Sequence, residues 1–115
     1  MIVDKCPFET LDNPSHAIRA DIEGDLFPIY NPIFTKFGLS GNGYSWEGVV
    51  IQVLEQEHPE LLQKIQFDPE AGGFYAFAEN KDVQLKFMDV LCPIFQDTKL
   101  LEQFLSSIDR TQIDD

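Results

Sequence analysis

Only a few side chains in this sequence could supply a nucleophile, a general base or a soft metal ligand. They are two histidines, His16 and His58, and two cysteines, Cys6 and Cys92. A thiol nucleophile needs a base beside it, and a zinc ion needs three or four ligands at defined spacings. The sequence contains neither an HExxH motif nor a paired-cysteine motif, and nothing local connects a cysteine to a histidine. We therefore expect no catalytic residue, no metal site and no cofactor, and we expect that the protein is not an enzyme.

The two cysteines lie far apart in the sequence, and their spacing leaves two states open. Cys92 falls on an apolar helical stripe, which favours a packed and inert thiol, whereas a disulfide with Cys6 is the alternative. The N-terminus has no apolar run typical of a secretory signal, and no uncharged stretch of about 18 residues could span a membrane. The sequence therefore predicts reduced cysteines in a cytoplasmic protein.

Carboxylates carry the strongest charge signal in the sequence. Its 115 residues include 20 acidic and 8 basic side chains, which gives a net charge of −12. Such a field repels nucleic acid and anionic membranes and speeds encounter with a basic partner, although the same charge also keeps a protein soluble. Asp21, Glu23 and Asp25 lack the twelve-residue loop of a calcium hand, so we interpret them as a solvated rim.

The acids are densest between residues 47 and 79, where Lys64 is the single basic side chain among seven carboxylates. If the elements that carry these acids adjoin, the acids form one acidic face; the alternative is an ordinary solvated helix face. The candidate partner contacts on such a face are Glu55, Glu57, Glu60, Asp68 and Glu70.

Four of the seven glycines fall within residues 38–50, directly before an apolar helical pattern. A phosphate-binding loop is disfavoured because the stretch lacks a Walker lysine and follows a predicted helix instead of a strand. We interpret it as a turn that tolerates positive φ, followed by Ser45 as the helix N-cap, with Tyr44 packing as a hydrophobic staple. Gly48 then indicates a close approach to another backbone. The predicted structural motif comprises Gly41, Asn42, Gly43, Tyr44, Ser45 and Trp46.

Three helices are indicated by apolar periodicity and by capping residues. The first covers residues 31–38, with Asn31 as its cap and Gly38 at its end; a start near Phe27 is the alternative, and it would place Pro32 awkwardly inside the helix. The second follows the glycines, and its buried stripe is Trp46, Val49, Val50, Val53 and Leu54. The third starts at Asn80, is kinked or broken near its end by Pro93, and has an inward side of Leu85, Met88, Leu91, Cys92 and Phe95.

A fourth helix is predicted from Asp97 or Thr98, followed by a polar tail over residues 111–115. Its inward residues are Leu100, Leu101, Phe104, Leu105 and Ile108. A strand pattern covers residues 16–22, and residues 8–11 before it are a possible partner. Two further strand patterns, residues 64–67 and 74–79, predict a hairpin. These elements predict one α+β domain over residues 1–115, with a small, mostly antiparallel sheet of about three strands and three to four helices packed on one face.

Two separated segments of the sequence resemble the immunity protein 51 family of bacterial polymorphic toxin systems. The resemblance covers about residues 30–105. Its matching positions are Gly41, Asn42, Gly43, Tyr44, Trp46, Pro59, Glu60, Leu61, Lys64, Ile65, Phe67, Asp68, Pro69, Glu70, Gly72, Phe74 and Ala76. Three positions depart from the family pattern: Ser45 stands where aspartate is more usual, Gly73 where a larger residue is usual, and Tyr75 where a small or sulfur-bearing one is.

The resemblance implies an α+β protein that is encoded beside a toxin gene, binds the toxin domain and protects the producing cell. It identifies no catalytic residue and no toxin-contacting residue. We therefore expect an immunity protein that neutralises a cognate secreted toxin domain, basic if that toxin is a nuclease, by stoichiometric binding. The alternative is a general acidic protein-binding or regulatory module unrelated to toxins, and the oligomeric state is open in both cases.

Overall fold

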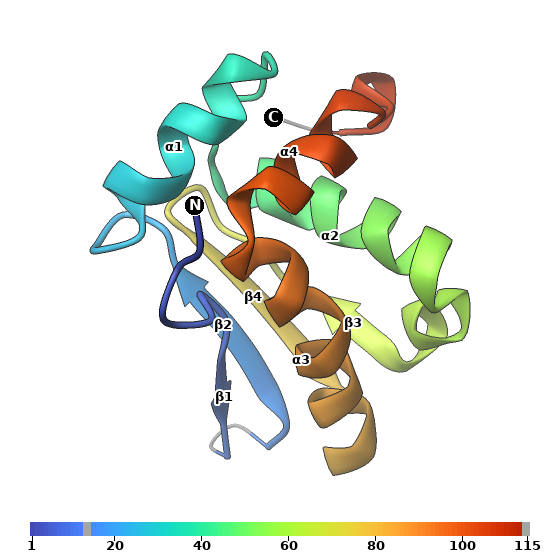
Figure 1. The fold of residues 1–115 in the computed structure, drawn as a ribbon. Coiled ribbons are helices and arrows are strands. Elements are labelled where there is room, and N and C mark those ends of the chain that lie inside the picture. The colour runs from blue at the N-terminus through green and yellow to red at the C-terminus, as the bar shows by residue number, and fades with distance from the viewer. Residues whose placement is uncertain (13–14, 114–115) are drawn as a thin grey trace.

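The computed structural model describes residues 1–12 and 15–113. Within them, strands and helices are combined in an α+β arrangement (Figure 1), as the sequence predicted. In chain order the elements are β1 (Glu9–Leu11), β2 (Ala17–Asp21), α1 (Phe27–Lys36), α2 (Gly43–Glu57), the 3₁₀ helix η1 (Pro59–Lys64), β3 (Ile65–Phe67), β4 (Gly73–Ala78), α3 (Lys81–Gln96), α4 (Thr98–Ser106) and the 3₁₀ helix η2 (Arg110–Gln112).

The described strands form one antiparallel sheet in the order β1-β2-β4-β3. It has one strand more than the three expected, because residues 9–11 pair with β2 in the register Glu9↔Arg19 to Leu11↔Ala17. The central pair, β2 and β4, is the longest, with five residues of each strand opposite one another. The predicted hairpin of β3 and β4 is confirmed.

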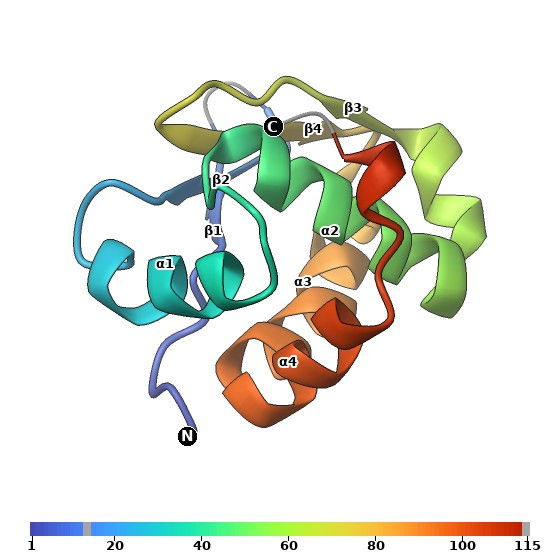
Figure 2. The same cartoon turned by 90° about the horizontal axis from the view of Figure 1, so that it is seen from above.

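The helices of the described chain cover one face of this sheet (Figure 2), and the other face carries none. Because side chains alternate along a strand, the inner face buries Ile18, Ala20, Phe74 and Ala76 completely. Helices α2 and α3 pack on β4, and α4 packs on α3. The core therefore lies between the sheet and the helices.

Aromatic rings fill the centre of this core. Phe8, only 2% exposed, packs edge-on against Trp46, Phe74, Phe87 and Phe95, with centroid distances from 4.9 to 5.7 Å. The Tyr30 hydroxyl donates a 2.8 Å hydrogen bond to the carbonyl of Phe95, and burial raises the pKa of Tyr30 to about 12. Residues from the N-terminal segment, α1, α2, β4 and α3 thus meet in one cluster.

Helix α1 begins at Phe27, so the prediction that Asn31 caps a helix at Pro32 is wrong. Pro28 occupies the first turn, where its missing N–H costs nothing, and Pro32 lies inside the helix. The buried residues of α1 are Tyr30 and Phe34, and the Pro32 ring lies on the solvent side. Pro32 has no N–H to donate to the carbonyl of Pro28, four residues earlier, and Pro28 is itself exposed. The predicted end is confirmed, with Gly38 at φ +83°.

Helix α2 begins earlier than predicted, and its N-cap is Asn42, not Ser45. The Asn42 side chain accepts a 2.9 Å hydrogen bond from the backbone N–H of Ser45. Tyr44 therefore lies inside the first turn, 37% exposed, instead of preceding the cap as a staple. The predicted stripe from Trp46 to Leu54 is confirmed as buried.

Helix α3 starts at the predicted cap, Asn80, which accepts from the N–H of Val83. Leu85, predicted to face inward, is 47% exposed. Because successive helical residues turn by about 100°, Leu85 points away from buried Phe87, two residues later. The helix continues through Pro93 to Gln96, and Asp97 caps α4 as predicted. In α4, Leu101 and Leu105 are buried, and Leu100 and Phe104 are partly buried against the core, as is Ile108 just after the helix.

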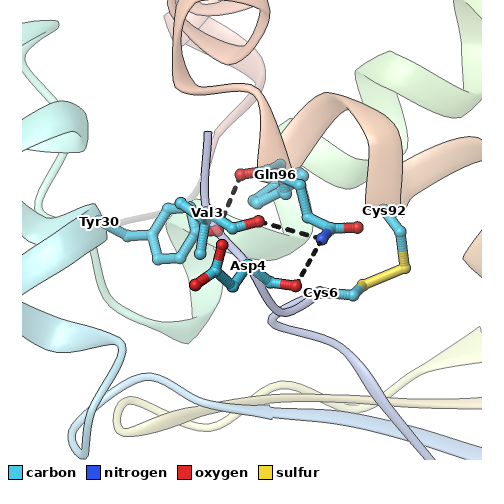
Figure 3. The surroundings of a disulfide bond; sticks show 7 residues. Val3, Asp4, Cys6, Tyr30, Cys92 and Gln96 are labelled. Atoms are coloured by element: carbon cyan, nitrogen blue, oxygen red, sulfur yellow. Dashed lines mark hydrogen bonds between the residues drawn. A yellow bond between two sulfur atoms is a disulfide. The ribbon is translucent and has the colours of Figure 1, made fainter. Parts of the chain in front are cut away.

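Cys6 and Cys92 form a disulfide, so the prediction of reduced cysteines is wrong and the alternative state is the one observed (Figure 3). The N-terminal segment runs beside the end of α3, where the N–H of Val3 donates to the carbonyl of Gln96 at 2.7 Å. The Gln96 side-chain amide donates back to the carbonyls of Val3 and Asp4. This antiparallel approach places two cysteines 86 residues apart in bonding distance.

The C-terminal segment is not simply a polar tail. Asp109 caps η2 through the N–H of Thr111, and Ile113 is buried against α2. A Cβ on Gly48 would lie 2.6 Å from Cγ1 of Ile113. Gly48 therefore makes room for a side chain of the C-terminal segment, and the predicted close approach is to that side chain instead of a backbone.

Candidate partner-binding surface

The chemistry-bearing residues are not assembled into a reactive centre in the part of the chain that the structure describes. Both cysteines are in the disulfide, and no group of three or more His, Cys, Asp or Glu side chains there could hold a metal ion. His58, directly after α2, contacts Glu60 of η1, whereas His16 precedes β2 in a left-handed conformation. Among the described residues we find no helix with the length and hydrophobicity that a membrane span requires.

The glycine-rich motif forms the junction between α1, α2 and the β3–β4 turn. Gly41 adopts φ +82°, which a glycine tolerates without strain. The N–H of Gly43 donates to the carbonyl of Ala71, and a Cβ at position 43 would overlap the carbonyl oxygens of Glu70 and Gly73. The buried hydroxyl of Ser45 accepts from the N–H of Gly41 at 3.1 Å, and Trp46 stacks on Phe34. This geometry holds the start of α2 against the hairpin.

Three of the predicted partner-binding acids lie together at the C-terminal end of α2. Glu55 and Glu57 are exposed in the last turn, and Glu60 follows in η1. Oε1 of Glu60 lies 2.6 Å from Nδ1 of His58, and this hydrogen bond is the main cause that lowers the pKa of Glu60 below its ordinary value. Glu60 is therefore engaged with a neighbouring side chain at this end of the helix.

The other two predicted acids, Asp68 and Glu70, lie at the opposite end of α2. They belong to the β3–β4 turn, whose residue Ala71 bonds to Gly43 at the helix start. A helix rises about 1.5 Å per residue, so about 18 Å of α2 separates this end from Glu55. The structure thus divides the five acids into two groups instead of one continuous cluster.

Asp68 and Glu70 have other carboxylates as neighbours. Asp21, at the end of β2, is paired with Gly73 on β4, and Glu70 bridges the same glycine from the other side. Glu23, in the loop after β2, reaches Gly72 so closely that a Cβ there would overlap its carboxylate. The sequence predicted a solvated rim for Asp21 and Glu23, because the pairing of β2 with β4, which brings them to the hairpin, has no local signal.

A groove adjoins these acids between the N-terminal segment and the loop from β2 to α1. Its volume is about 440 Å³, and its charged lining residues are Lys5, Glu9, Asp21 and Asp25. Three carboxylates and one ammonium group line it, so the groove continues the acidic character of the hairpin end.

Comparison with known proteins identifies one family. The sequence model for immunity protein 51 matches residues 28–110, which is most of the chain. No curated protein and no solved structure matches the chain.

Proposed function

Because the chain belongs to the immunity protein 51 family, we propose that it binds the domain of a cognate secreted bacterial toxin and neutralises it in a stoichiometric complex. The observation that carries this proposal is the family match over residues 28–110. Immunity by binding needs a stable scaffold and an exposed recognition surface, and it needs no catalytic group. We accordingly propose a single non-enzymatic domain that acts without a cofactor.

The charge of the chain supports a basic partner. A net charge of −12 raises the association rate with a basic protein, and it lowers the association rate with nucleic acid or with an anionic membrane. A nuclease toxin, whose cleft must attract phosphates, has the complementary charge. We propose that its contacts come from the predicted acids at the two ends of α2, which are Glu55, Glu57, Glu60, Asp68 and Glu70.

The test is co-purification with the C-terminal domain of a large secreted protein encoded beside this gene. We expect a one-to-one complex that abolishes the toxicity of that domain when both are expressed in one cell. Absence of binding, or binding without protection, would contradict the proposal and favour a general acidic protein-binding module. A toxin domain from an unrelated system is the control, since immunity depends on the cognate pair.

The compartment in which the complex forms is part of the proposal. We expect the cytoplasm, where a toxin entering the cell would act, but disulfides persist mainly in oxidising compartments. The state of Cys6 and Cys92 in living cells therefore tests this point. Thiol alkylation before lysis should modify both cysteines in a cytoplasmic protein, and protection of both would place the protein in an oxidising compartment.

A further inference from the structure

The face of the sheet opposite the helices is an open surface in the described structure (Figure 2). Strand alternation directs Tyr75 and Phe77 of the central strand β4 to this outer face, because their neighbours Phe74, Ala76 and Ala78 are buried on the inner face. Both aromatic side chains are half-buried, on the strand that hydrogen-bonds to β2 on one side and β3 on the other. Two aromatic rings are therefore presented on a rigid support.

Tyr75 is surrounded by charged neighbours on the adjacent strands. Arg19 on β2 lies directly opposite it, and Asp68 lies on the other side, with its N–H donating to the carbonyl of Tyr75 at 2.9 Å. One step toward the turn, Gly73 has Asp21 on one side and Glu70 on the other. The carboxylates of Asp21, Asp68 and Glu70 thus lie on the strands beside Gly73 and Tyr75. The Tyr75 ring lies over Gly73.

The positive charge beside Tyr75 is already engaged, whereas Lys64 lines a hollow with Phe77 nearer the other end of β4. Arg19 is paired with Glu9 of β1 at 3.8 Å, so it is compensated within the row that contains Tyr75. Asp21, Asp68 and Glu70 form no ion pair among those of the described residues. The surplus charge beside the ring is therefore negative.

We infer that this outer face, centred on Tyr75 and Phe77, is the docking surface for a basic, arginine- or lysine-rich surface of the toxin domain. The inference rests on the proposed function and names the part of the protein that performs it. A guanidinium or ammonium group over the Tyr75 ring would gain a cation–π contact and carboxylate partners at the same point. Buried aromatic anchors with a charged rim are the arrangement that supplies most affinity in protein interfaces.

Charge selects this occupant over two others. A second copy of the chain would bring the same carboxylates against each other, and each copy carries a net charge of −12. A nucleic acid would place phosphates beside Asp21, Asp68 and Glu70. A basic protein surface is complementary to both the rings and the rim.

The experiment uses the full chain and the toxin domain encoded beside it. Amide hydrogen exchange of the free protein and of the complex would locate the contact without any substitution. We expect the strongest protection at β4 and at the β3–β4 turn, and weaker protection at Glu55–Glu57.

Two pairs of variants then measure the contribution of each feature. Tyr75→Ala should raise the Kd at least about tenfold, which is the loss expected of an aromatic anchor, whereas Leu85→Ala, an exposed apolar residue on α3, should leave it unchanged. Asp68→Lys should slow association at low salt about tenfold or more, and Glu57→Lys should slow it less. Thermal unfolding of each variant confirms that the fold is retained.

The outcomes separate the two proposals. If the wild-type protein binds and neutralises the toxin domain but protection falls elsewhere and Tyr75→Ala binds normally, the outer face is not the docking surface and the immunity function stands. If the wild-type protein does not bind, the immunity function fails, and the inference fails with it. Weakened binding by Tyr75→Ala and Asp68→Lys, with protection on β4, supports both.

Discussion

The ring of Tyr75 lies over Gly73, two residues before it on the outer face of β4. A Cβ at position 73 would come within 2.8 Å of Cε2 and 3.0 Å of the hydroxyl oxygen of Tyr75. The absence of a side chain at Gly73 therefore lets the ring lie along the strand. These are the two hairpin positions that the family resemblance marked as departures, and the structure places them in contact with each other.

Gly73→Ala should displace the Tyr75 ring while leaving the fold intact. The colliding atoms belong to the end of an outward-facing side chain, which can rotate away, so we expect a change in unfolding free energy within about 1 kcal/mol. Toxin binding should weaken about as much as in Tyr75→Ala. Urea unfolding and binding titration measure the two effects, and unaltered affinity together with an unmoved ring would contradict the pairing.

Gly43→Ala should be far more damaging. Its Cβ would overlap the carbonyl oxygens of Glu70 and Gly73, which are backbone atoms of the hairpin and cannot rotate away. We expect a loss of at least about 2 kcal/mol of unfolding free energy. The matched control is Gly24→Ala in the exposed loop after β2, where the nearest atom is a side-chain oxygen of Asp21 at 3.3 Å and the expected change is within about 0.5 kcal/mol.

Removal of the disulfide should destabilise the N-terminal segment and the core together. The bond closes a loop of 86 residues, so its loss is expected to cost about 3–5 kcal/mol. Phe8 lies two residues after Cys6 and contacts four rings of the aromatic cluster. Without the disulfide, its segment is no longer covalently linked to α3. Urea unfolding of the Cys6→Ser, Cys92→Ser protein measures the loss, and faster exchange of the Val3 amide should accompany it. Equal stability of the two proteins would show that the hydrogen bonds to Gln96 suffice.

The contact of Glu60 with His58 should be visible in a pH titration. The pKa of Glu60 lies below its ordinary value of 4.5, with the His58 hydrogen bond as the first cause. A lowered carboxyl pKa stabilises the fold fully above the unfolded value, and this contribution is lost as the pH falls through the folded pKa. Carbon NMR titration should show the Glu60 pKa moving up toward 4.5 in His58→Ala. Identical titration in both proteins would exclude the contact in solution.

Local patterns were enough to predict the elements that rest on local chemistry. The buried stripe of α2, the Asn80 cap, the Asp97 start of α4 and the β3–β4 hairpin all follow from periodicity or from capping within a few residues. Two boundaries were wrong where rival local signals competed. Asn42 and Ser45 can both cap a helix, and Asn42 prevails because a start at Gly43 lets that glycine reach the hairpin carbonyls.

What the sequence by itself determined is therefore the α+β class, most elements, the surplus of negative charge and the family. Only the tertiary structure decided that Cys6 meets Cys92, that Ile113 fills the space over Gly48, and that Asp21 joins Asp68 and Glu70 around Gly73. The physical reason is distance along the chain. Periodicity and caps are short-range interactions written in neighbouring residues, whereas these contacts join segments dozens of residues apart and follow from how the helices pack on the sheet and from the pairing of β2 with β4.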